Sequence, residues 1–240
     1  MKNSMQLKAI VKNMAKSKNI PAQIALQNYM LERLLERISL SRYQSNFILK
    51  GGFLVASMVG LDTRATMDMD ATIKGLKVNA ESISNMLNEI CAVEMNDEVI
   101  FSLRRIEEMR ESADYRGFRV ALEAMYPPIK VPLKVDITTG DIITPKEIDY
   151  EFRLLFGSRS IRILAYNLET LMAEKLETTI ARGNQNTRPR DYYDIYIIRK
   201  LQWQNIDART LKKALFNTCR SRGTIHRSEE RRVGKECRSR

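Results

Sequence analysis

Apolar and polar positions alternate along this 240-residue chain in a pattern that predicts helices at its start and end and strands between them. Residues 5–16 and the segment after Pro21 place apolar side chains three or four positions apart, the spacing of one helix face. We expect two amphipathic helices that cover a sheet. Opposite the apolar stripe of the second helix runs a charged stripe of Glu32, Arg33, Glu36 and Arg37.

Three segments in the middle of the chain alternate apolar and polar side chains in the manner of half-buried strands. Residues 99–109 and 116–126 predict a pair of strands, and residues 129–137 predict a third strand with Lys134 and Asp136 on its polar face. Pro132 has no amide hydrogen to donate, so we expect this strand to start irregularly or as an edge.

A further helix is predicted for residues 79–93, and after Gly140 the pattern becomes mainly helical. Residues 152–163 predict short strands, and helices follow at 168–182, 189–201 and 208–220. We therefore expect an α/β (α+β) fold. A mixed sheet with flanking helices would occupy residues 1–150, and a helix-rich half would occupy residues 151–226.

The segment at residues 46–74 contains the candidate chemistry. A short apolar strand leads into the turn Lys50-Gly51-Gly52, and a small apolar helix at 53–59 follows. The chain then returns in a strand that carries Asp68 and Asp70 on one face, because strand side chains alternate. The opposite face, expected to point into the core, consists of Met67, Met69, Ala71 and Ile73.

Paired carboxylates on one strand face repel each other unless a cation lies between them, and hard oxygen ligands suit Mg²⁺. Asp136 offers a third carboxylate, and two Mg²⁺ ions about 3.5–4 Å apart can activate the attacking oxygen and stabilise the leaving oxygen at phosphorus. Glycines allow close approach of a ligand, and the helix after them offers free N–H groups to phosphate. The alternatives are an exposed aspartate at a strand end and an ordinary tight turn.

Composition narrows the class of protein. With 44% apolar and 29% charged residues, the chain resembles a soluble globular protein, and no apolar run approaches the roughly 18 residues of a membrane span. We expect a cytoplasmic protein without a signal peptide, because the basic N-terminus contains no continuous apolar block. Cys91, Cys219 and Cys237 are scattered and support neither a disulfide framework nor a zinc site.

Residues 227–240 resemble a translated sequencing-adapter oligonucleotide, so we expect the natural chain to be interrupted near His226. This segment holds six basic and three acidic residues, and without it the formal net charge falls from +11 to +8. The remaining positive charge still favours an anionic partner. His226 is the only histidine and lies at the junction, where it supports no catalytic role.

The Gly-Gly turn followed by the pair Asp68 and Asp70 resembles the metal-binding signature of the nucleotidyltransferase superfamily. The Lys-Gly-Gly lead and the Thr-Met-Asp-Met-Asp form are similar to the AbiEii-like toxins of type IV toxin–antitoxin systems, and Lys-Val-Asp136 resembles the second motif of that family. The resemblance implies that the three aspartates hold Mg²⁺, with Mn²⁺ as an alternative. It implies that a nucleoside triphosphate contacts the turn formed by Lys50, Gly51 and Gly52.

Two later segments resemble the third and fourth motifs of the same family. The Ala-Glu-Lys-Leu segment implies that Lys175 contacts the triphosphate, and the Arg-Pro-Arg-Asp-x-x-Asp run implies that Asp191 is required and that Arg188 and Arg190 lie near the phosphates. Without the resemblance, Lys175 fits a solvated helix face paired with a neighbouring glutamate, and Asp191 fits a helix N-terminus. Within the resemblance, Asp194 would hold Arg188 or Arg190 in place.

The resemblance implies an enzyme that transfers a nucleoside monophosphate from a nucleoside triphosphate to an acceptor hydroxyl and releases pyrophosphate. RNA, a tRNA 3′ end in particular, is the expected acceptor, and an antitoxin encoded nearby is the expected partner. Two alternatives remain open: a nucleotidyltransferase that modifies a small molecule such as an antibiotic, and a non-catalytic nucleotide- or RNA-binding protein. Tyr192, Tyr193 and Tyr196 would either pack in the protein or stack on a base.

Overall fold

The computed structural model describes residues 3–112, 115–183 and 186–225. The chain divides into two compact units, unit 1 (Met1–Gly140 and Asp149–Ala165) and unit 2 (Asp141–Ile148 and Tyr166–Arg240). The segment 227–240, which resembles a translated adapter sequence, lies outside the described residues.

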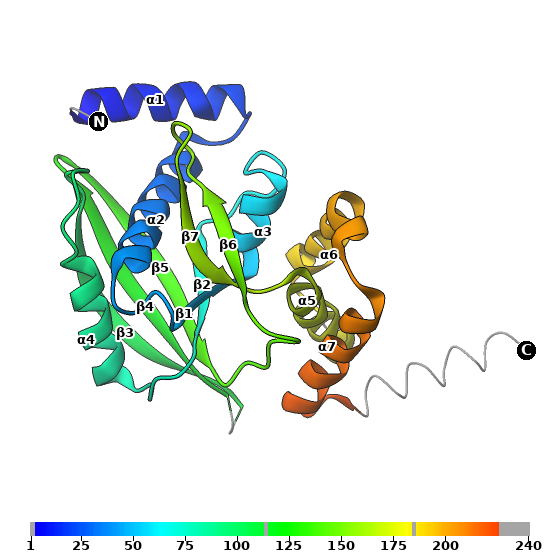
Figure 1. Ribbon diagram of the computed structural model, residues 1–240. Helices are drawn as coiled ribbons and strands as arrows, with labels where there is room; N and C mark the ends of the chain where they lie inside the picture. The colour runs from blue at the N-terminus through cyan, green and yellow to red at the C-terminus, as the bar shows by residue number, and fades with distance from the viewer. Residues whose placement is uncertain (1–2, 113–114, 184–185, 226–240) are drawn as a thin grey trace, which may run out of the picture. The chain divides into compact units, whose positions relative to one another are not determined.

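The described residues of unit 1 form a seven-stranded mixed sheet in the order β3-β4-β5-β2-β1-β7-β6 (Figure 1). Strand β1 pairs antiparallel with β2 and parallel with β7, and β2 pairs parallel with β5. This arrangement confirms the expected mixed sheet. The strands are β1 (Phe47–Lys50), β2 (Asp68–Ile73), β3 (Ile100–Ser112), β4 (Tyr115–Tyr126), β5 (Ile129–Thr139), β6 (Ile148–Arg153) and β7 (Ser160–Ala165).

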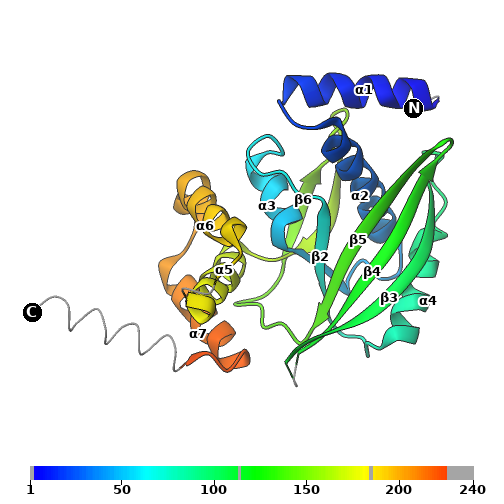
Figure 2. The ribbon, with the colours of Figure 1, turned by 180° about the vertical axis from the view of Figure 1, so that it is seen from behind.

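Helices cover the apolar face of this sheet. Helix α2 packs against β5, β7 and α4, and α4 packs against β3. Views from opposite sides show α2 and α4 together on one face of β3, β4 and β5 (Figures 1 and 2). The helices of unit 1 are α1 (Ser4–Ser17), α2 (Ala22–Leu40), α3 (Gly51–Val59) and α4 (Ala80–Cys91).

Strand β5 has the two faces that its alternation predicts. Leu133, Val135 and Ile137 are buried on the side of α2, and they alternate with the polar side chains of Lys134 and Asp136. Strand β5 gains its second neighbour, β2, only from Lys134 onward. The preceding proline therefore lies where the strand has one neighbour, as expected for a residue that cannot donate a ladder hydrogen bond.

Helix α2 differs from its expected form, because its charged stripe does not face water. Glu32, Arg33, Glu36 and Arg37 are all buried. Segments distant in sequence cover them and supply ionic partners, Asp97 from the loop before β3 and Arg159 from the turn between β6 and β7. Helix α2 therefore covers the sheet as expected, and its charged stripe is buried as well as its apolar one.

Strand β2 presents its two faces largely as expected. Met69, Ala71 and Ile73 are buried, whereas Asp68 and Asp70 are half-buried on the other face. Met67 was expected in the core and is exposed instead, because it precedes the first residue of the strand and is not held by its pairing.

Unit 2 is helical, with α5 packed against both α6 and α7. The side chain of Asn167 caps α5 by accepting a hydrogen bond from the Thr170 amide, and it also donates to the carbonyl oxygens of Thr144 and Lys146. Among the described residues of the two units, no helix combines the length and hydropathy needed to cross a membrane. The elements of unit 2 are α5 (Leu168–Arg182), α6 (Pro189–Gln202), η2 (Trp203–Asn205) and α7 (Ala208–Ser221).

Candidate active site

A row of four charged residues crosses the middle of the unit 1 sheet. Lys50 of β1 lies opposite Asp70 of β2, Asp70 lies opposite Asp136 of β5, and Asp136 lies opposite Arg119 of β4. Neighbouring strands are about 4.8 Å apart, and residues in register point to the same face. The sheet thus places two carboxylates side by side between two cations, with Asp68 two residues along β2 on the same face.

Basic side chains hold the carboxylates of Asp68 and Asp136. Arg119 donates from Nε and Nη2 to the two oxygens of Asp136, at 3.0 and 2.9 Å. Lys134 Nζ lies 3.1 Å from Asp68 Oδ2 and 3.9 Å from Asp136 Oδ2. The hydrogen bond to Asp136 raises the pKa of Arg119. These contacts offset the repulsion between the aspartates.

Asp70 is held against the start of α3. The amide of Gly52 lies 3.4 Å from Asp70 Oδ2, and Gly51 has φ +68°. A Cβ atom on Gly51 would lie 2.1 Å from the same oxygen, and one on Gly52 would lie 2.9 Å from Arg64 Nη2. Gly51 is therefore required both by space and by its left-handed backbone, whereas a side chain at Gly52 would displace the flexible end of Arg64.

The donor set around Asp70 matches Mg²⁺ in kind. Asp68, Asp70 and Asp136 supply carboxylate oxygens, which hard divalent cations prefer, from adjacent positions on one face. Within the described residues, no three His, Cys, Asp or Glu side chains converge closely enough to hold an ion as they stand. Arg119 and Lys134 occupy oxygens that a cation would use, so a metal would have to compete with these basic groups.

Unit 2 contains the second group of expected residues. Lys175 of α5 reaches two aspartates of α6, with Nζ 2.8 Å from Asp191 Oδ1 and 3.0 Å from Asp194 Oδ2. Burial alone would lower the pKa of Lys175, but the charges of Asp194 and Asp191 outweigh burial, and the pKa is raised. Asp191 Oδ2 is buried and has no hydrogen-bond partner among the described residues.

These contacts revise two expectations about unit 2. Lys175 forms ion pairs with Asp191 and Asp194 of α6. The neighbouring glutamates, Glu174 and Glu177, form ion pairs with Arg222. Asp194, which was expected to hold an arginine, forms its ion pair with Lys175. Two further residues expected near the phosphates, Arg188 and Arg190, are exposed at the start of α6.

Sequence reasoning gave the basic residues around the carboxylates no part in the site. It placed Lys134 on the polar face of β5 with Asp136, and their spacing of two could have indicated the contact. Arg119 could not be found in this way, because its place opposite Asp136 depends on the register between β4 and β5. Arg64 lies in the loop before β2, where no periodicity applies, and is buried against Gly52.

A mixed sheet with aspartates on adjacent strands, beside a Gly-Gly turn that opens a helix, defines a nucleotidyltransferase core. The family model described as nucleotidyl transferase AbiEii toxin, type IV TA system, matches residues 33–236. The chain belongs to this family of nucleotidyltransferase toxins from type IV toxin–antitoxin systems. No relative was found among curated proteins.

Solved structures support the fold. MenT4, a nucleotidyltransferase toxin from Mycobacterium tuberculosis H37Rv, is similar with a TM-score of 0.61 at 15% identity, over 87% of this chain and 68% of that one. JHP933 from Helicobacter pylori is similar with a TM-score of 0.51 at 16% identity, over 85% of this chain and 78% of that one.

Proposed function

We propose that this nucleotidyltransferase uses Mg²⁺ to transfer a nucleoside monophosphate from a nucleoside triphosphate to a hydroxyl of RNA, with a tRNA 3′ end as the acceptor. The observation that carries the proposal is the register of Asp70 and Asp136 on adjacent strands beside the Gly51-Gly52 turn. The excess of basic residues over the whole chain agrees with a nucleic-acid acceptor.

The reaction is an in-line displacement at the α-phosphorus. The acceptor hydroxyl oxygen forms a bond to phosphorus, the bond to the bridging oxygen of the β-phosphate breaks, pyrophosphate leaves, and the hydroxyl proton passes to water. Mg²⁺ held by Asp68, Asp70 and Asp136 would supply charge stabilisation at the phosphate oxygens. Such a site positions the reactants and stabilises charge without forming a covalent link to the protein.

Side chains of the chain itself have defined parts in this proposal. Gly51 and Gly52 let the side chains of Asp70 and Arg64 approach the start of α3 closely. The N–H groups at this helix start would favour the phosphates of the nucleotide. Lys50 lies opposite Asp70 and contributes positive charge beside the turn. Within unit 2, Asp191 holds Lys175 in position. The family resemblance assigns phosphate contacts to Lys175 and Arg190.

Labelled nucleotide tests the proposal. The protein is incubated with the four nucleoside triphosphates labelled at the α-phosphate, Mg²⁺ and bulk tRNA, and the RNA and small-molecule fractions are separated. The RNA should become labelled, and Asp70→Ala should abolish this labelling. The control Asp149→Ala changes an exposed aspartate of β6 and should leave the labelling unchanged. If label appears only in the small-molecule fraction, the acceptor is a small molecule and not RNA. Nucleotide binding that is independent of Mg²⁺, with no transfer of label to any acceptor, would contradict the proposal.

The family assignment implies an antitoxin partner, and we infer that it silences the transfer in the cytoplasm, where nucleoside triphosphates and tRNA are present. Co-expression with the adjacent reading frame should restore growth to cells that express this chain. Failure to restore growth, while Asp70→Ala does restore it, would contradict that frame as the antitoxin.

A further inference from the structure

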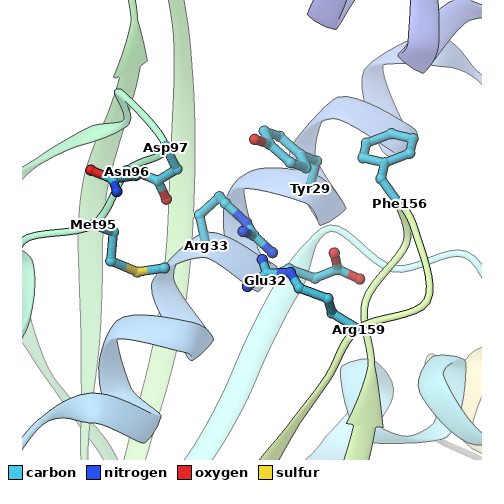
Figure 3. Close-up of a pocket in the computed structure, with 8 residues that line it drawn as sticks. All are labelled: Tyr29, Glu32, Arg33, Met95, Asn96, Asp97, Phe156 and Arg159. Carbon is cyan, nitrogen blue, oxygen red and sulfur yellow. The ribbon is translucent and has the colours of Figure 1, made fainter. Parts of the chain in front are cut away.

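Unit 1 contains a cavity of about 280 Å³ that the proposed transfer does not use. Three elements form it: α2, the loop between α4 and β3, and the turn between β6 and β7 (Figure 3). Its volume lies just below the range of about 300–1,000 Å³ typical of sites for drug-sized ligands. A small metabolite is therefore the appropriate size of occupant.

Guanidinium groups from two elements gather at this cavity. Arg33 Nη1 lies 2.6 Å from Glu36 Oε2, and Arg159 Nη1 lies 2.9 Å from Glu36 Oε1, so two guanidinium groups share one carboxylate. Asp97 does not compensate, because Arg37 binds both of its oxygens at 2.8 Å. Three guanidinium groups thus meet the carboxylates of Glu36 and Asp97, and Glu32 adds a third carboxyl group to the cavity.

A buried donor at the cavity lacks a partner. The side chain of Arg33 is 7% exposed, and its Nε is buried without a hydrogen bond among the described residues. An unsatisfied buried donor carries a desolvation cost of about 1–3 kcal/mol or more for a charged group. An anion bound beside Arg33 would satisfy this donor and balance the charge.

Glu32 lines the same cavity, and its protonation state changes the net charge there. Both of its oxygens lie 3.0 Å from the amide of Leu155, and burial raises its pKa to about 8, although that amide and Arg33 oppose the shift and Glu36 adds to it. Below that pH the carboxyl is mainly neutral. The positive excess is therefore present at neutral pH and decreases as Glu32 ionises.

Aromatic rings form another wall of the cavity. The ring centroids of Tyr29 and Phe156 lie 5.4 Å apart at an angle of 50°, and the guanidinium of Arg33 lies 5.3 Å from the centroid of Tyr29. Figure 3 shows both rings on the same side of Arg33 and Arg159. The lining therefore combines a flat apolar surface with guanidinium donors.

We propose that this cavity binds a small organic anion that carries a carboxylate or phosphate group on a flat apolar body. The anionic group would accept from Arg33 Nε and from Arg159, and the flat body would contact Tyr29 and Phe156. The site is separate from the row of charged residues on β1, β2, β5 and β4, and its binding does not depend on the transfer reaction.

Calorimetric titration of the full chain at pH 6.5 tests this site with benzoate, phenyl phosphate and phenol. At least one of the two anions should bind with one-to-one stoichiometry and at least tenfold more tightly than phenol, and the tighter anion identifies the preferred head group. Arg159→Ala should weaken that binding at least tenfold. Arg159 is 62% exposed in its side chain, so this variant should fold.

Two matched variants separate this site from other anion sites. Arg162→Ala changes an exposed arginine of β7, and Asp70→Ala changes the proposed active site; both should bind the anion as the original chain does. Benzoate stays ionised between pH 6.5 and 9, so its affinity should fall over this range and should stay constant in Glu32→Gln. Equal binding of phenol, absence of binding by both anions, or unchanged affinity in Arg159→Ala would overturn the proposal.

Discussion

Replacement of Glu32 by glutamine should remove most of the pH dependence of unit 1 stability between pH 5 and 9. The carboxyl is 3% exposed, and burial raises its pKa from 4.5 to about 8. Because the pKa is raised in the folded state, the stabilising contribution is fully present below about pH 4.5. It is lost as the pH rises through 8.

The size of the effect follows from the shift. Each pKa unit corresponds to about 1.4 kcal/mol, so the free energy of unfolding should fall by about 5 kcal/mol when Glu32 is fully ionised in the folded chain. Few other groups interfere, because the only histidine is His226 and burial raises the pKa of Cys91 to about 11. Glutamine mimics the neutral carboxyl and can still accept from the amide of Leu155.

Urea denaturation followed by circular dichroism at pH 5, 6, 7, 8 and 9 gives the free energy of unfolding, and hydrogen exchange of the α2 amides reports on unit 1 alone. Stability of the original chain should fall across this range, whereas Glu32→Gln should give a nearly flat profile that exceeds it at pH 9. Parallel profiles for the two chains would refute the reasoning, because they would mean that Glu32 is already ionised at low pH.

Three further predictions concern the candidate active site. Gly51→Ala should abolish transfer and lower the free energy of unfolding by about 1–2 kcal/mol, because alanine is strained in the left-handed backbone of this position. The control Gly157→Ala is also at positive φ but in open space, so it should lose stability and keep activity. Activity retained by Gly51→Ala would contradict the crowding with Asp70. Lys134→Ala should tighten Mn²⁺ binding in a titration followed by electron paramagnetic resonance, because it removes a competing cation, and weaker binding would contradict this role. Asp194→Asn should destabilise unit 2 by roughly 1–3 kcal/mol in urea denaturation, since it removes a buried partner of Lys175; an unchanged midpoint would contradict the ion pair.

Local patterns in the sequence predicted much of the fold. Helix α5 begins and ends at the residues that its periodicity predicted, 168 and 182, and the alternation in β5 correctly assigned Lys134 and Asp136 to the polar face. These features depend on neighbours in the sequence, so a period of 3.6 or 2 residues is enough to find them.

Features that depend on distant segments could not be predicted from the sequence. The charged stripe of α2 has the pattern of a solvated face, and only the loop before β3 and the turn before β7 bury it. The register that places Arg119 opposite Asp136 is likewise a property of strand pairing. The ion pairs of Lys175 needed the packing of α5 on α6, which its own helix does not encode.

The position of the label in the nucleotide tests the central claim most directly. Transfer assays with bulk tRNA and Mg²⁺ are run in parallel with triphosphates labelled at the α- or the γ-phosphate, using the original chain and Asp136→Asn. The account predicts that α-label enters the acceptor, that γ-label leaves as pyrophosphate, and that Asp136→Asn transfers neither. Incorporation of γ-label, or full α-label transfer by Asp136→Asn, would contradict it.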